Sequence, residues 1–187
     1  MNIKDYEVMV FRKNCILQLA SFNNADKKEW KKLFDSWKKL KLGLRIFQSR
    51  EPNFPEGLSE VAFCLFSGSK RFISLTGSVS GSFDTYNTRT GKAEQIKACS
   101  VESDLTSFGP KSKWDDLYFL DFYNGDKLDG KFNVYKIPSK LIYNMEVNKT
   151  QTMKQQQKEG RRPRFSIRDN IINKYNIKPI GKNVKVW

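Results

Sequence analysis

The chain has 187 residues, of which 39% are hydrophobic and 14 are phenylalanine, so it is long and apolar enough for one domain with a sizeable core. Its 34 Lys and Arg against 20 Asp and Glu give a formal charge of +14, which favours a polyanionic partner. The absence of histidine excludes Ser-His-Asp and Cys-His catalysis and histidine-ligated metal sites, so any catalysis must depend on carboxylates, lysines and hydroxyl groups.

Two amphipathic helices are predicted at the start of the chain, over residues 3–20 and 26–42, and Gly43 follows the second. The second helix has a row of apolar side chains at helical spacing: Trp30, Leu33, Phe34 and Trp37. We expect its two tryptophans in the core. The opposite face carries Lys27, Lys28, Lys31, Lys32, Lys38 and Lys39. This lysine face is interpreted as a solvated surface, with direct phosphate contact as the alternative.

A third helix is predicted in the segment NFPEGLSEVAFCLF, with Pro55 near its first position, where a missing N–H costs nothing. Glu56 and Glu60 share one face of this helix, opposite the apolar side chains that would pack inward. They are either plain surface acids or functional carboxylates. The glycine- and serine-rich stretch GSKRFISLTGSVSGS then leads into the next predicted strand.

A β-hairpin is predicted from FDTYN and AEQIKACS, joined by TRTG at residues 88–91. With that loop, Asp84 lies opposite Gln95, and Lys97 follows on the same face of its strand. Strand alternation places Glu94 on the other face. A slip of one residue would reverse this choice.

The remaining predicted elements are two aromatic-rich strands, LYFLDFY and FNVYKI, separated by the turn-like NGDKLDGK. From Lys140 onward the chain holds 12 Lys and Arg against 3 Asp and Glu, which makes this segment a basic arm. Within it, Ser166 and Asp169 predict a capping box at the start of a short helix.

The predicted hairpin gathers groups that suit phosphodiester hydrolysis. Mg²⁺ prefers oxygen ligands and keeps several waters, so Asp84 would hold the metal. Lys97 would orient the attacking water or help to deprotonate it. Gln95 would be a weaker, neutral ligand, and Glu60 from the preceding helix would supply the missing charge.

This order of residues resembles the core of the PD-(D/E)xK nucleases, with a helix bearing Glu60, a strand bearing Asp84 and a strand ending in Gln95-Ile96-Lys97. The segment CSVESDLTSFGPKSKWDDLYFLDF also resembles small type II restriction endonucleases. Together with NFPEGLSE and GRRPRFSIRDNII, the similarity covers most of residues 45–180.

The resemblance departs from the family pattern at two positions. Phe83 stands where the motif often has proline, and Gln95 replaces the usual acid. Glu94 is therefore kept as the alternative metal ligand if the register differs. The resemblance implies a restriction-endonuclease-like α/β fold with a mixed sheet of about 4–6 strands flanked by helices. It also implies Mg²⁺-dependent cleavage of double-stranded DNA at a short recognition sequence.

DNA contacts are expected from side chains suited to phosphates and base edges: Arg161, Arg162, Arg164, Lys111, Lys113 and Ser107. For the arginines the alternative is a disordered basic tail that gives only nonspecific attraction. For Ser107, which begins the sequence Ser-Phe-Gly-Pro, the alternative is a role in shaping a turn.

We expect one domain over residues 1–187, with N-terminal helices in 1–43, a catalytic core in 52–137 and a basic DNA-binding segment in 140–187. A two-fold symmetric DNA site would match a homodimer. A cognate DNA methyltransferase is expected in the same system, although not as a stable subunit. No segment approaches the roughly 20 apolar residues that span a bilayer, and three cysteines without a CxxC pair fit a prokaryotic cytoplasm.

Two other functions stay open from the sequence. In a nonenzymatic nucleic-acid-binding module, Asp84 and Lys97 would form an ordinary cross-strand ion pair. A structure-specific repair nuclease would use the same centre but prefer DNA shape over sequence. Metal-dependent cutting at discrete sequence positions is expected of a restriction enzyme and of neither alternative.

Overall fold

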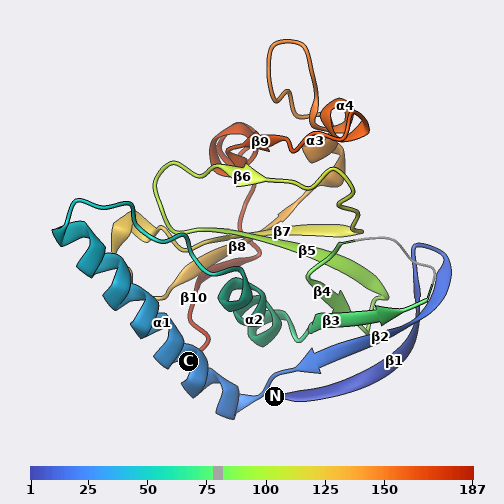
Figure 1. Ribbon diagram of the computed structural model, residues 1–187, viewed down its shortest axis with the longest axis horizontal. Helices are drawn as coiled ribbons and strands as arrows, with labels where there is room; N and C mark the ends of the chain where they lie inside the picture. Colours follow the sequence, from blue (N-terminus) through green and yellow to red (C-terminus); the bar gives the residue numbers. More distant parts are fainter. Residues whose placement is uncertain (78–81) are drawn as a thin grey trace.

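The computed structural model describes residues 1–77 and 82–187, and a large mixed sheet crosses its middle (Figure 1). Among these residues the sheet has 8 strands, more than the sequence predicted, in the order β1-β2-β3-β4-β5-β7-β8-β10. Their bounds are β1 Asn2–Val10, β2 Lys13–Ser21, β3 Lys70–Thr76, β4 Thr85–Asn87, β5 Lys92–Cys99, β7 Asp116–Asp121, β8 Phe132–Ile137 and β10 Gly181–Val184. The β5–β7 pair is parallel, and the other neighbours are antiparallel.

The predicted helix over residues 3–20 is wrong, because this segment forms the β1–β2 hairpin. Consequently the N-terminal region 1–43 is not all helical. The buried side chains of β2 include Cys15, Leu17 and Leu19, which alternate with a period of two and line one face of a strand. The turn is closed by Phe11 and Arg12 at positive φ, a conformation that usually favours glycine or asparagine, so the sequence carried no turn signal there.

Helices α1 (Asn24–Ile46) and α2 (Glu56–Ser67) cover one face of the sheet (Figure 1). The side chain of Asn23 accepts the N–H of Ala25, and Asp26 accepts the N–H of Asn23, which completes a capping box. The helix runs past Gly43 instead of ending before it. The two tryptophans are buried as predicted, whereas Leu33 is exposed.

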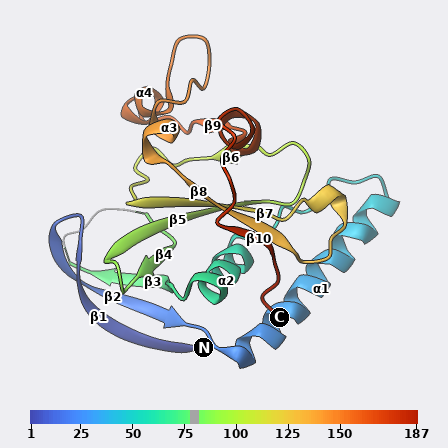
Figure 2. The same cartoon turned by 180° about the vertical axis from the view of Figure 1, so that it is seen from behind.

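The opposite face is covered by the C-terminal half of the chain, so the basic segment is folded and is not a loose tail. The elements on this face are β6 Thr106–Ser107, α3 Ser139–Tyr143, α4 Met153–Lys158, β9 Arg164–Phe165 and η2 Arg168–Asn173. The short turn η1 Asn124–Asp126 lies instead beside α1, where Asp126 pairs with Arg45. Strands β6 and β9 form a separate antiparallel pair. The predicted bond from Ser166 to the N–H of Asp169 is present at 2.9 Å, just before η2. Seen from behind, both chain ends lie near α1 (Figure 2).

Strands β5 and β7 separate two apolar cores. Ile96 and Tyr118 pack under α1 and α2 with Trp30 and Phe34. Phe119 packs on the other side, with Phe108, Phe165 and the isoleucines of the η2 region. All three cysteines are buried and free. In the described part of the chain, no helix is both long and apolar enough to cross a bilayer.

The β1–β2 turn generates a stability prediction. Arg12 is exposed at φ 68°, which an L side chain adopts only at a cost. Arg12→Gly should raise the free energy of unfolding by about 0.5–1 kcal/mol, because glycine relieves this strain and its larger chain entropy cancels only part of the gain. Urea unfolding would measure the change. Asn14→Gly, within β2, should lower stability, and equal losses for both variants would contradict the prediction.

Candidate active centre on strands β4 and β5

The predicted hairpin register is confirmed. Thr85 pairs with Glu94 and Asn87 pairs with Lys92, and residues 88–91 form the connecting turn. The alternation on β5 also agrees, because Ile96 packs under α2, whereas the Lys97 ammonium lies 5.7 Å from the centre of the Phe108 ring on the other face. Glu94 is 1% exposed and accepts a 2.8 Å hydrogen bond from the Thr85 hydroxyl, so it points away from Asp84.

Asp84 immediately precedes β4 and is anchored to β5 by backbone and side-chain bonds. Its N–H donates to the carbonyl of Glu94 at 2.9 Å, and its Oδ2 accepts the N–H of Ile96 at 2.7 Å. The side-chain amide of Gln95 donates to the same Oδ2. Two of the predicted residues are therefore in direct contact, and the carboxylate orientation is fixed by the β5 backbone.

The electrostatic surroundings of Asp84 include the other predicted residues. The pKa of Asp84 is raised to about 7, mainly because burial disfavours the charged form and to a smaller extent because of the charges of Glu60 and Glu56. The Ile96 N–H and the Lys97 ammonium act in the opposite direction. Asp84 is partly buried and takes part in none of the ion pairs found among the described residues.

Glu60 is held by a neighbour that the sequence interpretation missed. Its Oε2 lies 2.5 Å from Nε of Arg71, which stands beside Thr85 in the β3–β4 pairing. The sequence does not single out Arg71, because the glycine- and serine-rich character of its segment gives no sign of β3. Glu56 was also left out of the predicted centre, although its spacing of four residues from Glu60 on one helix was a usable signal.

A pocket of about 730 Å³ opens next to Ile96 of β5, whose N–H binds Asp84, although Asp84, Gln95 and Glu60 are not among its lining residues. One wall comes from the α1–α2 loop and the start of α2, including Glu56. The other wall runs from the end of β5 to β6, including Lys97 and Ser107, and Arg164 of β9 also lines it. The hydroxyl of Ser107 is buried with no hydrogen-bond partner in the described structure.

The predicted DNA-contact residues do not all lie at this pocket. Two of the predicted residues, Ser107 and Arg164, line the pocket and pair with each other across the β6–β9 ribbon. Arg161 does not line the pocket and forms a 3.1 Å ion pair with Glu159. Lys111 and Arg162 are exposed, and the ammonium of Lys113 lies 4.4 Å from the ring centre of Phe11; none of these lines the pocket.

The pocket wall after β5 is tied down by residues from the C-terminal half. Asp104 is buried and accepts the N–H of Ile167 at 2.9 Å and the hydroxyl of Ser166. Arg168 donates to the carbonyls of Val101 and Glu102 and pairs with Asp121 at 2.6 Å. Neither Asp104 nor Arg168 was predicted, because these contacts join segments about 60 residues apart.

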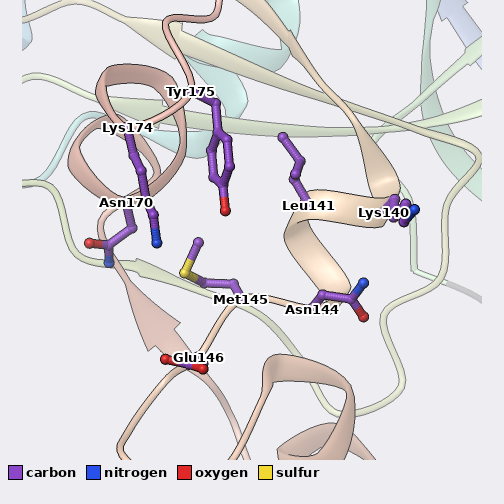
Figure 3. A pocket seen from close by; sticks show the side chains of 8 residues that line it. All are labelled: Lys140, Leu141, Asn144, Met145, Glu146, Asn170, Lys174 and Tyr175. Carbon is purple, nitrogen blue, oxygen red and sulfur yellow. The ribbon is translucent and has the colours of Figure 1, made fainter.

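A second pocket of about 490 Å³ lies between α3 and η2 and contains none of the predicted residues. Tyr175 and Lys174 reach toward Met145 there, and Glu146 is its one carboxylate (Figure 3). A single acid without a neighbouring carboxylate, amide and lysine does not reproduce the arrangement around Asp84.

The residues around Asp84 fit a divalent ion of the Mg²⁺ type. In residues 1–77 and 82–187, no three His, Cys, Asp or Glu side chains converge as a ready-made metal cluster. Mg²⁺ does not need one, because it binds through one or two carboxylates and fills its other positions with water and substrate phosphate. The partly buried Asp84 carboxylate forms no ion pair among the described residues and lies next to an amide and a second acid, which together make such a donor set.

Comparison with known proteins agrees with this geometry. The type II restriction enzyme Bsp6I from Bacillus sp. (strain RFL6) is 34% identical over 172 residues, covering 89% of this chain and 94% of that protein. A family model described as Bsp6I restriction endonuclease matches residues 22–174. The chain belongs to the Bsp6I restriction endonuclease family. No solved structure matches it.

Membership of the Bsp6I family confirms the predicted resemblance to type II restriction endonucleases. The matched region contains Asp84, Gln95, Lys97 and both pocket walls, whereas the β1–β2 hairpin and β10 lie outside it. Type II restriction endonucleases generally depend on a divalent metal ion, which agrees with the donor set around Asp84.

The raised pKa of Asp84 generates a prediction for the metal-free protein. The folded state keeps this proton up to about pH 7, whereas the unfolded chain releases it near pH 4, so stability should fall as the pH rises between these values. Asp84→Asn keeps an acceptor for both hydrogen bonds but has no charge. The substitution should remove the fall in stability with pH, and above pH 7 it should raise the free energy of unfolding by roughly 2–4 kcal/mol.

Urea unfolding in EDTA at pH 5 and pH 8 measures this difference. Asp35→Asn, which removes an exposed carboxylate of α1, is the matched control and should leave the pH dependence unchanged. An unaltered fall in stability in the Asp84→Asn variant would show that another group causes it.

Proposed function

We propose that this chain hydrolyses double-stranded DNA at a short recognition sequence as a type II restriction enzyme, with Asp84, Gln95 and Lys97 at the centre of the reaction. One observation carries the proposal: the partly buried Asp84 carboxylate, which forms no ion pair among the described residues, is bonded to β5 next to the pocket that Lys97 and Arg164 share. Membership of a restriction endonuclease family gives this arrangement its reaction class.

The centre is proposed to be a variant of the PD-(D/E)xK motif, with Gln95 in the position of the second acid. The supporting features are the confirmed register, the contact between Gln95 and Asp84, and the helix that carries Glu60 alongside. Because Glu94 is turned away and bonded to Thr85, Gln95 is the proposed ligand. Its carbonyl oxygen stays available when its amide group donates to Asp84.

Asp84, Gln95 and Glu60 are the residues proposed to hold Mg²⁺. When bound, the ion would supply positive charge to the phosphate under attack and make water a stronger nucleophile. For Glu60 to contribute, it must either use its second oxygen or leave Arg71. Asp84 and Glu60 are the only negative charges in this proposed ligand set, which agrees with the preference of Mg²⁺ for sites completed by water and substrate phosphate.

The chain's own residues position the reacting groups. The Lys97 ammonium, fixed over the Phe108 ring, is placed to orient the attacking water and to stabilise charge on the phosphate oxygens. The water oxygen bonds to phosphorus while the bond to the leaving sugar oxygen breaks, and that oxygen ends protonated. Gln95 and the Ile96 N–H hold Asp84 in one orientation throughout.

DNA recognition is proposed to use the β6–β9 ribbon, since a two-stranded ribbon fits the major groove. The Ser107 hydroxyl has no hydrogen-bond partner among the described residues, and Arg164 is an exposed side chain that lines the same pocket. Arg161, Arg162, Lys111 and Lys113 would then contact DNA outside the pocket. We further propose action as a homodimer in a prokaryotic cytoplasm, with a methyltransferase that protects host DNA.

Cleavage of a long DNA of known sequence tests the centre. The unaltered protein should give discrete fragments with Mg²⁺ and none with EDTA. Asp84→Ala and Lys97→Ala should each lower the cleavage rate by at least about 10³-fold, because each removes a group that acts on the reacting phosphate. Binding of DNA should largely survive. Lys92→Ala, at the exposed start of the same strand, is the control and should cut normally.

The other outcomes separate the alternatives. Tight, salt-sensitive binding without cutting under any metal condition would leave a basic binding module. Cutting that follows branched or mismatched DNA, whatever its sequence, would indicate a repair nuclease. Full activity in the Asp84→Ala variant would place the chemistry elsewhere.

Arg164 generates a separate prediction for binding. If it neutralises a phosphate, Arg164→Ala should weaken DNA binding at low salt and reduce the slope of log affinity against log salt by about 0.9. Fluorescence anisotropy in Ca²⁺ or EDTA, across a salt series, measures this slope. Arg89→Ala removes the same type of side chain from the β4–β5 turn, next to the C-terminal end of α2, and should change neither value. Equal effects of both substitutions would argue against a specific role for Arg164.

A further inference from the structure

One lysine of α1 lies on the buried face of the helix, whereas the predicted lysine face is in contact with solvent. Lys41 continues the stripe of Trp30, Phe34 and Trp37 at helical spacing, and its side chain is 0% exposed. A buried charge is costly unless it is paired and hydrogen-bonded. Its partners therefore indicate what this lysine does.

The Lys41 ammonium has three neighbours. It donates to the backbone carbonyl of Ser100 at 3.1 Å and lies 3.0 Å from Oε2 of Glu51. It also lies 5.3 Å from the ring centre of Trp37. The two polar contacts reach different segments of the chain, one directly after β5 and the other in the α1–α2 loop.

These two segments lead into opposite walls of the pocket beside Asp84. Ser100 lines the pocket itself and follows Lys97 by three residues. Glu51 lies between Arg50 and Asn53, which line the other wall, and the chain then leads to Glu56 at the start of α2. Lys41 thus joins both walls from behind, where solvent does not reach it.

We propose that Lys41 is a positioning residue for cleavage, which sets the spacing between Lys97 on one wall and the start of α2, with Glu56, on the other. This inference rests on the proposed function. A buried ion pair often contributes little to stability compared with apolar side chains of similar size. The pair does fix the distance between the two segments, because Ser100 and Glu51 both contact the same ammonium group.

Arg45 provides the matched control one turn further along α1. It pairs with Glu51 and, at 2.6 Å, with Asp126, and within the described residues none of its hydrogen bonds or ion pairs reaches the segment after β5. Arg45→Met therefore removes ion pairs of the same network and leaves both contacts of Lys41 in place. Lys41→Met keeps most of the side-chain volume and removes the connection between the walls.

The experiment compares single-turnover cleavage by the unaltered protein and by Lys41→Met, Arg45→Met and Lys97→Ala, at a temperature where circular dichroism shows each to be folded. Lys41→Met should cut about 10- to 100-fold more slowly, because small displacements of reacting groups have effects of this size. Its DNA affinity should be unchanged. Amide hydrogen exchange in residues 96–104 should accelerate in Lys41→Met and not in Arg45→Met.

Normal cleavage by folded Lys41→Met would overturn the inference. If that variant does not fold, Glu51→Gln decides, because it loosens the contact with the α1–α2 loop and preserves the packing of Lys41. It should slow cleavage, and a normal rate would overturn the inference. If Lys97→Ala cuts normally, the proposed centre itself is wrong. If Lys97→Ala is inactive and Lys41→Met is normal, only the role of Lys41 fails.

Discussion

The parallel pairing of β5 with β7, combined with the antiparallel pairing of β5 with β4, is the constraint on which the rest depends. It buries β5 on both faces, so a one-residue slip would put Lys97 into the core under α2 and Ile96 against Phe108. The two cores therefore fix the register. That register in turn places the Ile96 N–H and the Gln95 amide next to Asp84, so the arrangement around Asp84 follows from how the sheet is packed.

The parts that could be predicted from sequence are those in which local chemistry decides the structure. A four-residue turn between alternating strands set the pairing of Asp84 with Gln95, and Asn23 with Asp26 begins α1 by a contact within one turn. The burial of Trp30 and Trp37 followed from helical periodicity. In each case the interacting residues are close in sequence, or one face of an element is plainly apolar.

The parts that could not be predicted depend on contacts between distant segments. Phe11 and Arg12 form a turn without glycine or asparagine, because β2 gains more by packing Leu17 and Leu19 than the turn loses in strain. The pairing of β6 with β9 joins residues far apart in sequence, and the lysine inside the stripe of α1 donates to a carbonyl in the distant segment after β5. No window of neighbouring residues contains this information.

The β6–β9 ribbon has a consequence for attempts to redesign sequence preference. Each strand has only two residues, and the segment before β6 continues directly from the strand that carries Lys97. On the proposed function, the elements that read DNA and those that cut it share a few hydrogen bonds around Asp104. New loops grafted in place of residues 157–164 would disturb catalysis as well as recognition, so selection for altered specificity has to screen for turnover at the same time.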